Sequence, residues 1–92
     1  MTNYDKGANF ERRVMKHLRS QGFRVHRTAG SHTPIDVMAG IDGKCYGIQC
    51  QIEKYFIPAK VEALMDEAQE YGAVPMLCWR DAKNKICLKE IQ

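Results

Sequence analysis

The sequence contains no long apolar run, and it has only three prolines and one tryptophan. A helix needs about 18 or more consecutive apolar residues to span a bilayer, so the sequence predicts no membrane association. The first residues, MTNYDKGANFERR, lack the apolar centre of a secretory signal, and we therefore expect a cytoplasmic protein. With 92 residues the chain can form one domain with a modest core, which we predict to cover residues 1–92.

The four cysteines are not arranged as metal ligands. None belongs to a CxxC pair, and none has the spacing of a zinc site. In a reducing compartment, single cysteines within apolar runs usually serve as small hydrophobic side chains. We therefore interpret all of them as structural thiols: Cys45, Cys50, Cys78 and Cys87.

Charge is unevenly distributed along the chain. Residues 1–30 contain seven Lys and Arg against two acidic residues, whereas residues 61–92 contain four basic and six acidic residues. A basic segment can bind a polyanion such as DNA, but a solvated helix face would explain the charge equally well. The candidate DNA contacts are Lys6, Arg12, Arg13, Lys16, Arg19 and Arg27, with Ser31 and His32 in the following loop.

Apolar periodicity predicts two helices. The first begins at Asn3 or Asp5 and ends near Ser20, with a stripe of Phe10, Val14 and Leu18 and a stop at Gly22. The second begins at Pro58 and ends at residues 71–72.

Five strands are predicted around these helices. They are FRVHR (23–27), IDVMA (35–39), residues 44–54, VPMLCW (74–79) and KICLKEI (85–91). The pair Asp42-Gly43 marks a hairpin turn. The order α-β-β-β-α-β-β predicts an α/β fold, a mixed five-stranded sheet with a helix on each side.

Polar residues on the predicted elements suggest a site. In the third strand Gln49, Gln51 and Glu53 would share one face, because residues two apart point the same way. Asp36 ends the loop RTAGSHTP on the neighbouring strand, and Glu11 lies at the edge of the buried helix stripe. We expect Glu11, Asp36, Gln49 and Gln51 to converge, with Arg27 and Ser31 at the mouth of the site. Plainer interpretations stay open: Glu11 as a surface residue, Asp36 as a loop cap, and Ser31 and His32 as turn residues.

Several segments together resemble a known family. They are KGANFERRV, GFRVHRTAGSHTPIDVMA, IQCQ and YFIPAKVEALMDEAQEYGAVPMLCW. In this order they resemble the archaeal-type Holliday junction resolvases, members of the PD-(D/E)XK nuclease superfamily, over nearly the whole chain. The resemblance implies a restriction-endonuclease-like fold.

The resemblance also implies an activity and a site. It implies a homodimeric endonuclease, dependent on Mg²⁺ or Mn²⁺, that cuts four-way DNA junctions symmetrically, in archaea or encoded by a virus or phage acting in the host cytoplasm. The implied catalytic residues are Glu11, Ser31, Asp36 and the positions of Gln49 and Gln51. The implied metal ligands are Glu11, Asp36, Gln49 and the backbone carbonyl of Cys50. The implied dimer contacts are Leu64, Glu67 and Tyr71.

One motif departs from the family. The family has Glu-x-Lys where this chain has Gln49-Cys50-Gln51. A glutamine oxygen can ligate a hard cation without adding charge, but an amide cannot replace a lysine's positive charge. Three explanations stay open: a deliberately inactivated protein, a natural variant whose cation comes from Lys54 or Lys60, and a natural protein that binds junctions without cutting them. A restriction-like or repair nuclease acting on other duplexes is a further alternative.

Overall fold

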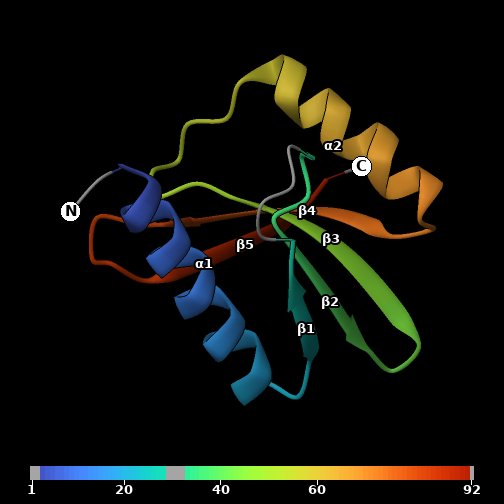
Figure 1. Cartoon of the computed structure of the whole chain (residues 1–92), viewed down its shortest axis with the longest axis horizontal. Coiled ribbons are helices and arrows are strands. Elements are labelled where there is room, and N and C mark those ends of the chain that lie inside the picture. Colours follow the sequence, from blue (N-terminus) through green and yellow to red (C-terminus); the bar gives the residue numbers. More distant parts are fainter. Residues whose placement is uncertain (1–2, 29–32, 92) are drawn as a thin grey trace.

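The computed structural model describes residues 3–28 and 33–91, with side chains from residue 6 onward. The elements are α1 (Asn3–Ser20), β1 (Arg24–Arg27), β2 (Val37–Ile41), β3 (Lys44–Cys50), α2 (Pro58–Glu70), β4 (Val74–Arg80) and β5 (Ile86–Glu90) (Figure 1). This order confirms the predicted α/β class and the sequence of elements.

The strands form one mixed sheet in the order β1-β2-β3-β4-β5. All neighbours are antiparallel except β3 and β4, which are parallel and joined through α2. Successive residues of β3 face opposite sides of the sheet: Ile48 belongs to the cluster under α1, whereas Gly47 lies against Ala68 of α2. The two helices therefore cover opposite faces, as the order of elements predicted.

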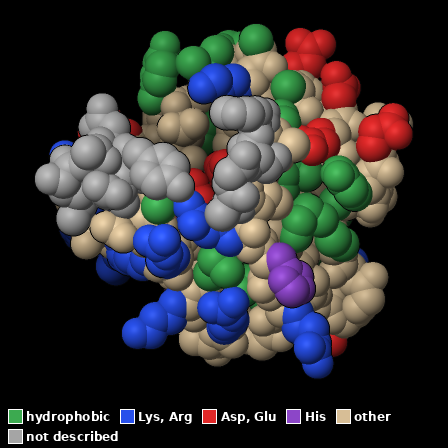
Figure 2. Space-filling view, in the orientation of Figure 1, with side chains coloured by type: hydrophobic (Ala, Val, Ile, Leu, Met, Phe, Trp, Pro, Cys, Tyr) green, Lys and Arg blue, Asp and Glu red, His purple; other side chains and the backbone are tan. Residues whose placement is uncertain are grey.

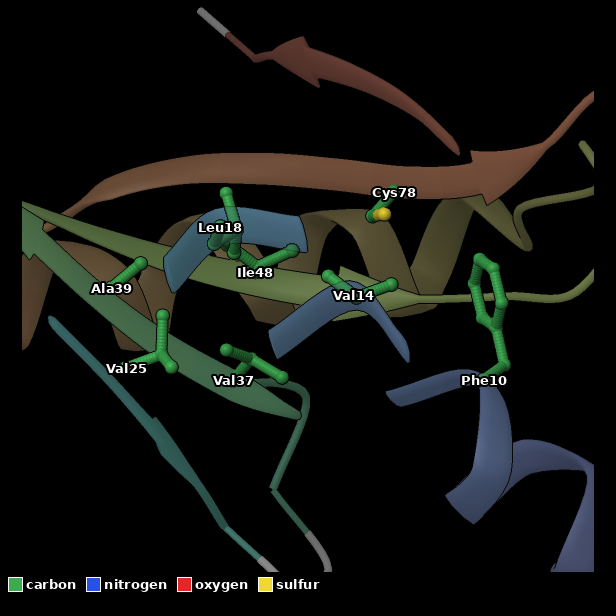
Figure 3. Close-up of a cluster of buried hydrophobic side chains, with 8 residues drawn as sticks. All are labelled: Phe10, Val14, Leu18, Val25, Val37, Ala39, Ile48 and Cys78. Carbon is green, nitrogen blue, oxygen red and sulfur yellow. The ribbon is translucent and has the colours of Figure 1, made fainter. Parts of the chain in front are cut away.

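The main core lies between α1 and the sheet (Figure 3). Phe10, Val14 and Leu18 follow one another at four-residue spacing and are all buried, which confirms the predicted stripe. Burying a large apolar side chain of this kind contributes about 1.5–3 kcal/mol. The stripe packs on Val25, Val37, Ala39, Ile48 and Cys78 of the sheet.

Two turns follow their predicted chemistry. α1 ends before Gly22, whose φ of 96° is in the left-handed region, and the Phe23 N–H closes the end by donating to the Leu18 carbonyl at 3.1 Å. Asp42 and Gly43 have φ values of 51° and 79°, the pattern of a type I′ hairpin turn. Both positions confirm the sequence prediction.

The end of β3 differs from the prediction. The strand ends at Cys50, not near Lys54, and residues 52–54 form a bend. The chain turns there because it must leave the sheet to reach α2 and cross over to β4. Backbone pairing with β4 nevertheless continues, because the Gln51 N–H donates to the Cys78 carbonyl and the Arg80 N–H donates to the Ile52 carbonyl. Ile52 also packs with Cys50 on the α1 side, so the expectation that Gln51 continues the face of Gln49 stays a prediction.

Candidate active site

Asp36 lies immediately before β2 and is held by β3. Its backbone N–H donates to the Ile48 carbonyl at 2.8 Å, and its Oδ2 accepts the Cys50 N–H at 2.8 Å. Regular pairing between β2 and β3 stops at Ile48, so the Cys50 N–H has no backbone acceptor on β2. The Asp36 carboxylate accepts its hydrogen bond instead. The two bonds flank Gln49 and fix Asp36 opposite it.

The environment of Asp36 favours its neutral form. Burial is the main cause that raises its pKa from 3.8 to about 6, and the negative charge of Glu11 raises it further. The Cys50 N–H and the positive charges of Arg27 and Lys60 act in the opposite direction. The structure therefore brings the carboxylates of Glu11 and Asp36 close enough to interact.

Glu11 forms an ion pair across two elements. Its Oε1 accepts a hydrogen bond from Arg27 Nε at 2.7 Å, joining α1 to β1. The two side chains are only 19% and 16% exposed, so this pair is better shielded from water than a surface salt bridge. Glu11 is thus directed toward the sheet, and Arg27 holds a positive charge beside the two carboxylates.

Gln49 is buried, with 5% of its surface exposed. It shares the α2-facing side of β3 with Gly47, two residues earlier. Its Oε1 is buried and accepts no hydrogen bond from any described residue. A buried acceptor without a partner costs about 1–3 kcal/mol, so this oxygen is suited to a donor or cation that the described residues do not provide.

Cys50 contributes to the site through its backbone N–H, which binds Asp36, and not through its thiol. Its thiol lies on the α1 side, where it hydrogen-bonds Cys78, its neighbour in the parallel register. This bond is the main cause that raises the pKa of the Cys50 thiol well above its ordinary value, and burial adds to the effect. The interpretation of Cys50 as a structural thiol agrees with this environment.

Gln51 occupies a different environment from Gln49. Its backbone N–H donates to the Cys78 carbonyl at 2.9 Å, and the residue lines a cleft of about 870 Å³. The cleft lies between the first half of α1 and the ends of β3 and β4, and it is also lined by Lys6, Phe10, Arg13, Tyr55 and Arg80. Gln51 therefore borders an open cleft, whereas Gln49 is buried.

The basic and acidic residues occupy different regions of the visible face. In Figure 2, Lys and Arg side chains gather over α1 and β1, and acidic side chains gather over α2. Arg12 is exposed and hydrogen-bonds Asn9 at 3.2 Å. Arg13, in contrast, donates to the Asn84 side-chain oxygen at 2.8 Å and also to the Asn84 carbonyl. Asn84, which sequence reasoning did not single out, has φ 64° in the turn before β5, and only the turn residues DAKN hinted at it.

The remaining predicted residues fall into three groups. Ser31 and His32 lie outside the described residues. Leu64 has no exposed surface within the monomer, so its prediction as a dimer contact was wrong. Glu67 has a buried Oε2 without a partner among the described residues, whereas Tyr71 is 66% exposed. Of the two lysines considered as substitutes, Lys54 lies over the Trp79 ring, with its Nζ 5.2 Å from the ring centroid.

The described residues contain neither a metal-binding cluster of His, Cys, Asp and Glu side chains nor a membrane-spanning helix. No cluster of three or more His, Cys, Asp and Glu side chains that could hold a metal ion is found among residues 3–28 and 33–91. Within the same ranges no helix has the length and apolar character needed to cross a membrane.

Comparisons with known proteins identify the family. The family model described as archaeal Holliday junction resolvase (Hjc) matches residues 2–92. The chain is 33% identical over 78 residues to the crossover junction endodeoxyribonuclease Hjc of Methanocaldococcus jannaschii, covering 80% of this chain and 58% of that relative's length. It also resembles the structure of Archaeoglobus fulgidus Hjc, a Holliday junction resolvase, with a TM-score of 0.79 and 27% identity over 89% of this chain and 73% of the other. The chain therefore belongs to the archaeal Holliday junction resolvase (Hjc) family.

Proposed function

We propose that this protein is a metal-dependent endonuclease that binds four-way DNA junctions and cuts them symmetrically. The observation that carries the proposal is the pair of interacting carboxylates, Glu11 and Asp36, fixed beside the buried Gln49. Family membership supports junction DNA as the substrate. The proposal places cleavage at this pair of carboxylates and not in the 870 Å³ cleft that Gln51 lines.

The residues present fit a hard divalent cation. Glu11 of α1, Asp36 just before β2 and Gln49 of β3 offer oxygen donors, the donor type that Mg²⁺ and Mn²⁺ prefer. Asp36 uses Oδ2 for the Cys50 N–H, which leaves Oδ1 for a ligand, and the Gln49 Oε1 has no donor among the described residues. In our proposal these three side chains hold the ion, with the Cys50 carbonyl as a fourth donor.

Hydrolysis joins a water oxygen to phosphorus and breaks one P–O ester bond, leaving a hydroxyl and a phosphate end. A bound divalent ion supplies an activated water and offsets the charge that develops on phosphorus. Asp36 contributes a fixed anionic oxygen, since its hydrogen bond to Cys50 sets the carboxylate plane. Arg27 orients Glu11 through the 2.7 Å hydrogen bond.

The two glutamines set how well the site works. Gln49 provides a neutral oxygen where the family has a carboxylate, so we expect weaker metal binding than in a Glu-x-Lys enzyme. Gln51 provides no positive charge. A protein that binds junctions without cutting them is the second candidate function, and the neutral Gln51 is the observation that favours it.

We also propose that the protein acts as a homodimer, because two matched nicks require two sites and one chain supplies one. Tyr71, at the end of α2, is exposed, and we propose that it contacts the second copy in the dimer. A monomeric mass in light scattering at micromolar concentration, with or without junction DNA, would refute the dimer.

The proposed function is tested by cleavage of an immobile four-way junction beside a linear duplex of the same sequence. With Mn²⁺ or Mg²⁺ we expect paired nicks in the junction, intact duplex, and no nicks from Asp36→Asn. Asp66→Asn, which changes an exposed acid of α2, is the matched control and should cut normally. If only Gln49→Glu/Gln51→Lys protein cuts, the unaltered chain is a junction-binding protein; if neither cuts, the assigned site is wrong.

A further inference from the structure

The crossover between β3 and β4 fixes the direction of α2. These strands are parallel neighbours, so the helix that connects them runs antiparallel to β3. The contact point is known: a Cβ built on Gly47 would lie 3.7 Å from the Ala68 Cβ. Because Ala68 is near the end of α2, the beginning of α2 must lie toward the end of β3.

One row of the helix leads from this contact to Lys60. Lys60, Leu64 and Ala68 are four residues apart, and the last two are fully buried. Four helical residues rise about 6 Å, close to the roughly 6.6 Å covered by two strand residues. If Ala68 lies over Gly47, Leu64 lies near Gln49, and Lys60 near Gln51. A long helical side chain also points back toward the helix N-terminus, which extends Lys60 further over this end of β3.

Asp36 lies on the same side of the sheet end. Ile35 contacts the α2-facing side of β3, because a Cβ on Gly47 would come within 2.8 Å of its Cδ1. The positive charge of Lys60 reaches Asp36 and lowers its pKa, although less than Arg27 does.

The competing lysine already has a partner. Lys54 Nζ lies over the Trp79 ring at 5.2 Å from its centroid, a cation–π contact. Lys60 is exposed, and its side chain makes no hydrogen bond or ion pair within the described residues. The first turn of α2 also contains no acidic residue that would compete for it.

We infer that Lys60 supplies the positive charge that Gln51 cannot, with its ammonium group binding a non-bridging oxygen of the scissile phosphate. This inference rests on the proposed nuclease function and adds a catalytic residue to it. The ammonium is a compact charge with three donors on a flexible stem, so it can reach the phosphate from a helix instead of from β3. Removing one such transition-state donor typically lowers a rate by about 100- to 1,000-fold.

Single-turnover cleavage of the four-way junction tests this role. Lys60→Ala should lower the rate on the order of 100-fold, and Lys60→Arg should recover part of it. Lys54→Ala removes the same charge from the Trp79 contact and should leave the rate nearly unchanged. Adding Gln51→Lys should restore cutting to the Lys60→Ala protein while changing the unaltered chain little. Equal rates for Lys60→Ala and Lys54→Ala, or an equal gain from Gln51→Lys in both backgrounds, would overturn the inference.

A binding measurement tests the phosphate contact without cleavage. Junctions carrying a neutral methylphosphonate at each phosphate around the branch point are compared with the unmodified junction in the absence of divalent metal. At the phosphate that Lys60 contacts, the methylphosphonate should weaken binding by the unaltered chain. The same methylphosphonate should not weaken binding by Lys60→Ala protein, but it should still weaken binding by Lys54→Ala protein. If no position shows this coupling, Lys60 does not contact the phosphates and the inference fails. Failure of the nuclease proposal is separate: it appears as absent cutting even by the Gln49→Glu/Gln51→Lys protein.

Discussion

At Asp36 the needs of the site oppose those of folding. Its pKa is about 6 in the folded protein against 3.8 ordinarily, so the folded state holds this proton more tightly than the unfolded chain does. Below pH 3.8 both states are protonated and the group has no effect on stability. Between pH 3.8 and about 6 the unfolded chain releases this proton while the folded protein keeps it, so stability falls, by roughly 3 kcal/mol in total, and above the folded pKa the loss is constant.

Asp36→Asn should therefore stabilise the protein in a pH-dependent way. Asparagine still offers an oxygen to the Cys50 N–H, but it carries no charge to desolvate. We expect a gain of several degrees in Tm above neutrality, since about 1 kcal/mol corresponds to 4–8 °C in a domain of this size. The gain should vanish near pH 4. Thermal unfolding of both proteins across this range measures it, and a gain that is equal at acid and neutral pH would refute the assignment.

Gln49→Glu should exchange stability of the metal-free protein for metal affinity. A third carboxylate would be buried near Glu11 and Asp36, and a buried charge without a partner is strongly destabilising. With Mn²⁺ the same charge should tighten binding by about tenfold or more, since ligand charge sets affinity for hard cations. Calorimetry and thermal shifts with and without Mn²⁺ provide the measurements. Gln69→Glu, on the exposed face of α2, should change neither quantity.

At the scale of elements, Gly47 sets how closely α2 and the Asp36 segment approach β3. A Cβ there would lie 2.8 Å from Ile35 Cδ1 and 3.2 Å from its Cγ1, so Gly47→Ala must displace Ile35 or the helix. We expect a cost of about 1–3 kcal/mol in urea unfolding, together with slower cutting because Asp36 follows Ile35. Gly7→Ala is the control: its Cβ meets nothing within 4 Å in α1, and it should stabilise by about 1 kcal/mol. If Gly47→Ala also stabilises, the packing described here is wrong.

The elements differ in how far their sequence determined them. α1, α2 and the Asp42-Gly43 turn were predictable because periodicity, Pro58 and Gly22 act locally. The end of β3 was not, because the alternation of residues 49–53 continues in the sequence while the chain turns toward α2.

The candidate site shows the same division between local and long-range information. The approach of Glu11 to Asp36 followed from helix and strand periodicity. Sequence spacing could not show that Lys54 contacts the Trp79 ring, because this contact depends on how the chain folds after β3. Nor could it show that Leu64 lies wholly inside the monomer.

At the scale of the whole molecule, the separation of charge predicts how DNA binding responds to salt. Basic residues over α1 and β1 would contact mainly phosphates, because a junction is recognised by its shape. The logarithm of affinity should fall with the logarithm of salt concentration by about 0.9 per phosphate contacted. Fluorescence anisotropy with four-way and linear DNA measures this slope.

Matched variants locate the contacts on the surface. Lys16→Ala on α1 should reduce the salt slope by about one contact, whereas Lys89→Ala on β5, where the lysine is also exposed, should leave it unchanged. A slope that both variants reduce equally, or an affinity equal for linear and four-way DNA, would count against a junction-binding face on α1.

The hydrogen bonds between Arg13 and Asn84 connect α1 to the turn between β4 and β5, across 71 positions of the chain. A contact at this separation can form only after most of the chain has been ordered, because closing so long a loop costs entropy. We therefore expect it to be absent from the folding transition state. Its energy then acts on the rate of unfolding and leaves the rate of folding nearly unchanged. The side chain that was expected to hold DNA would in this way determine how long each molecule stays folded.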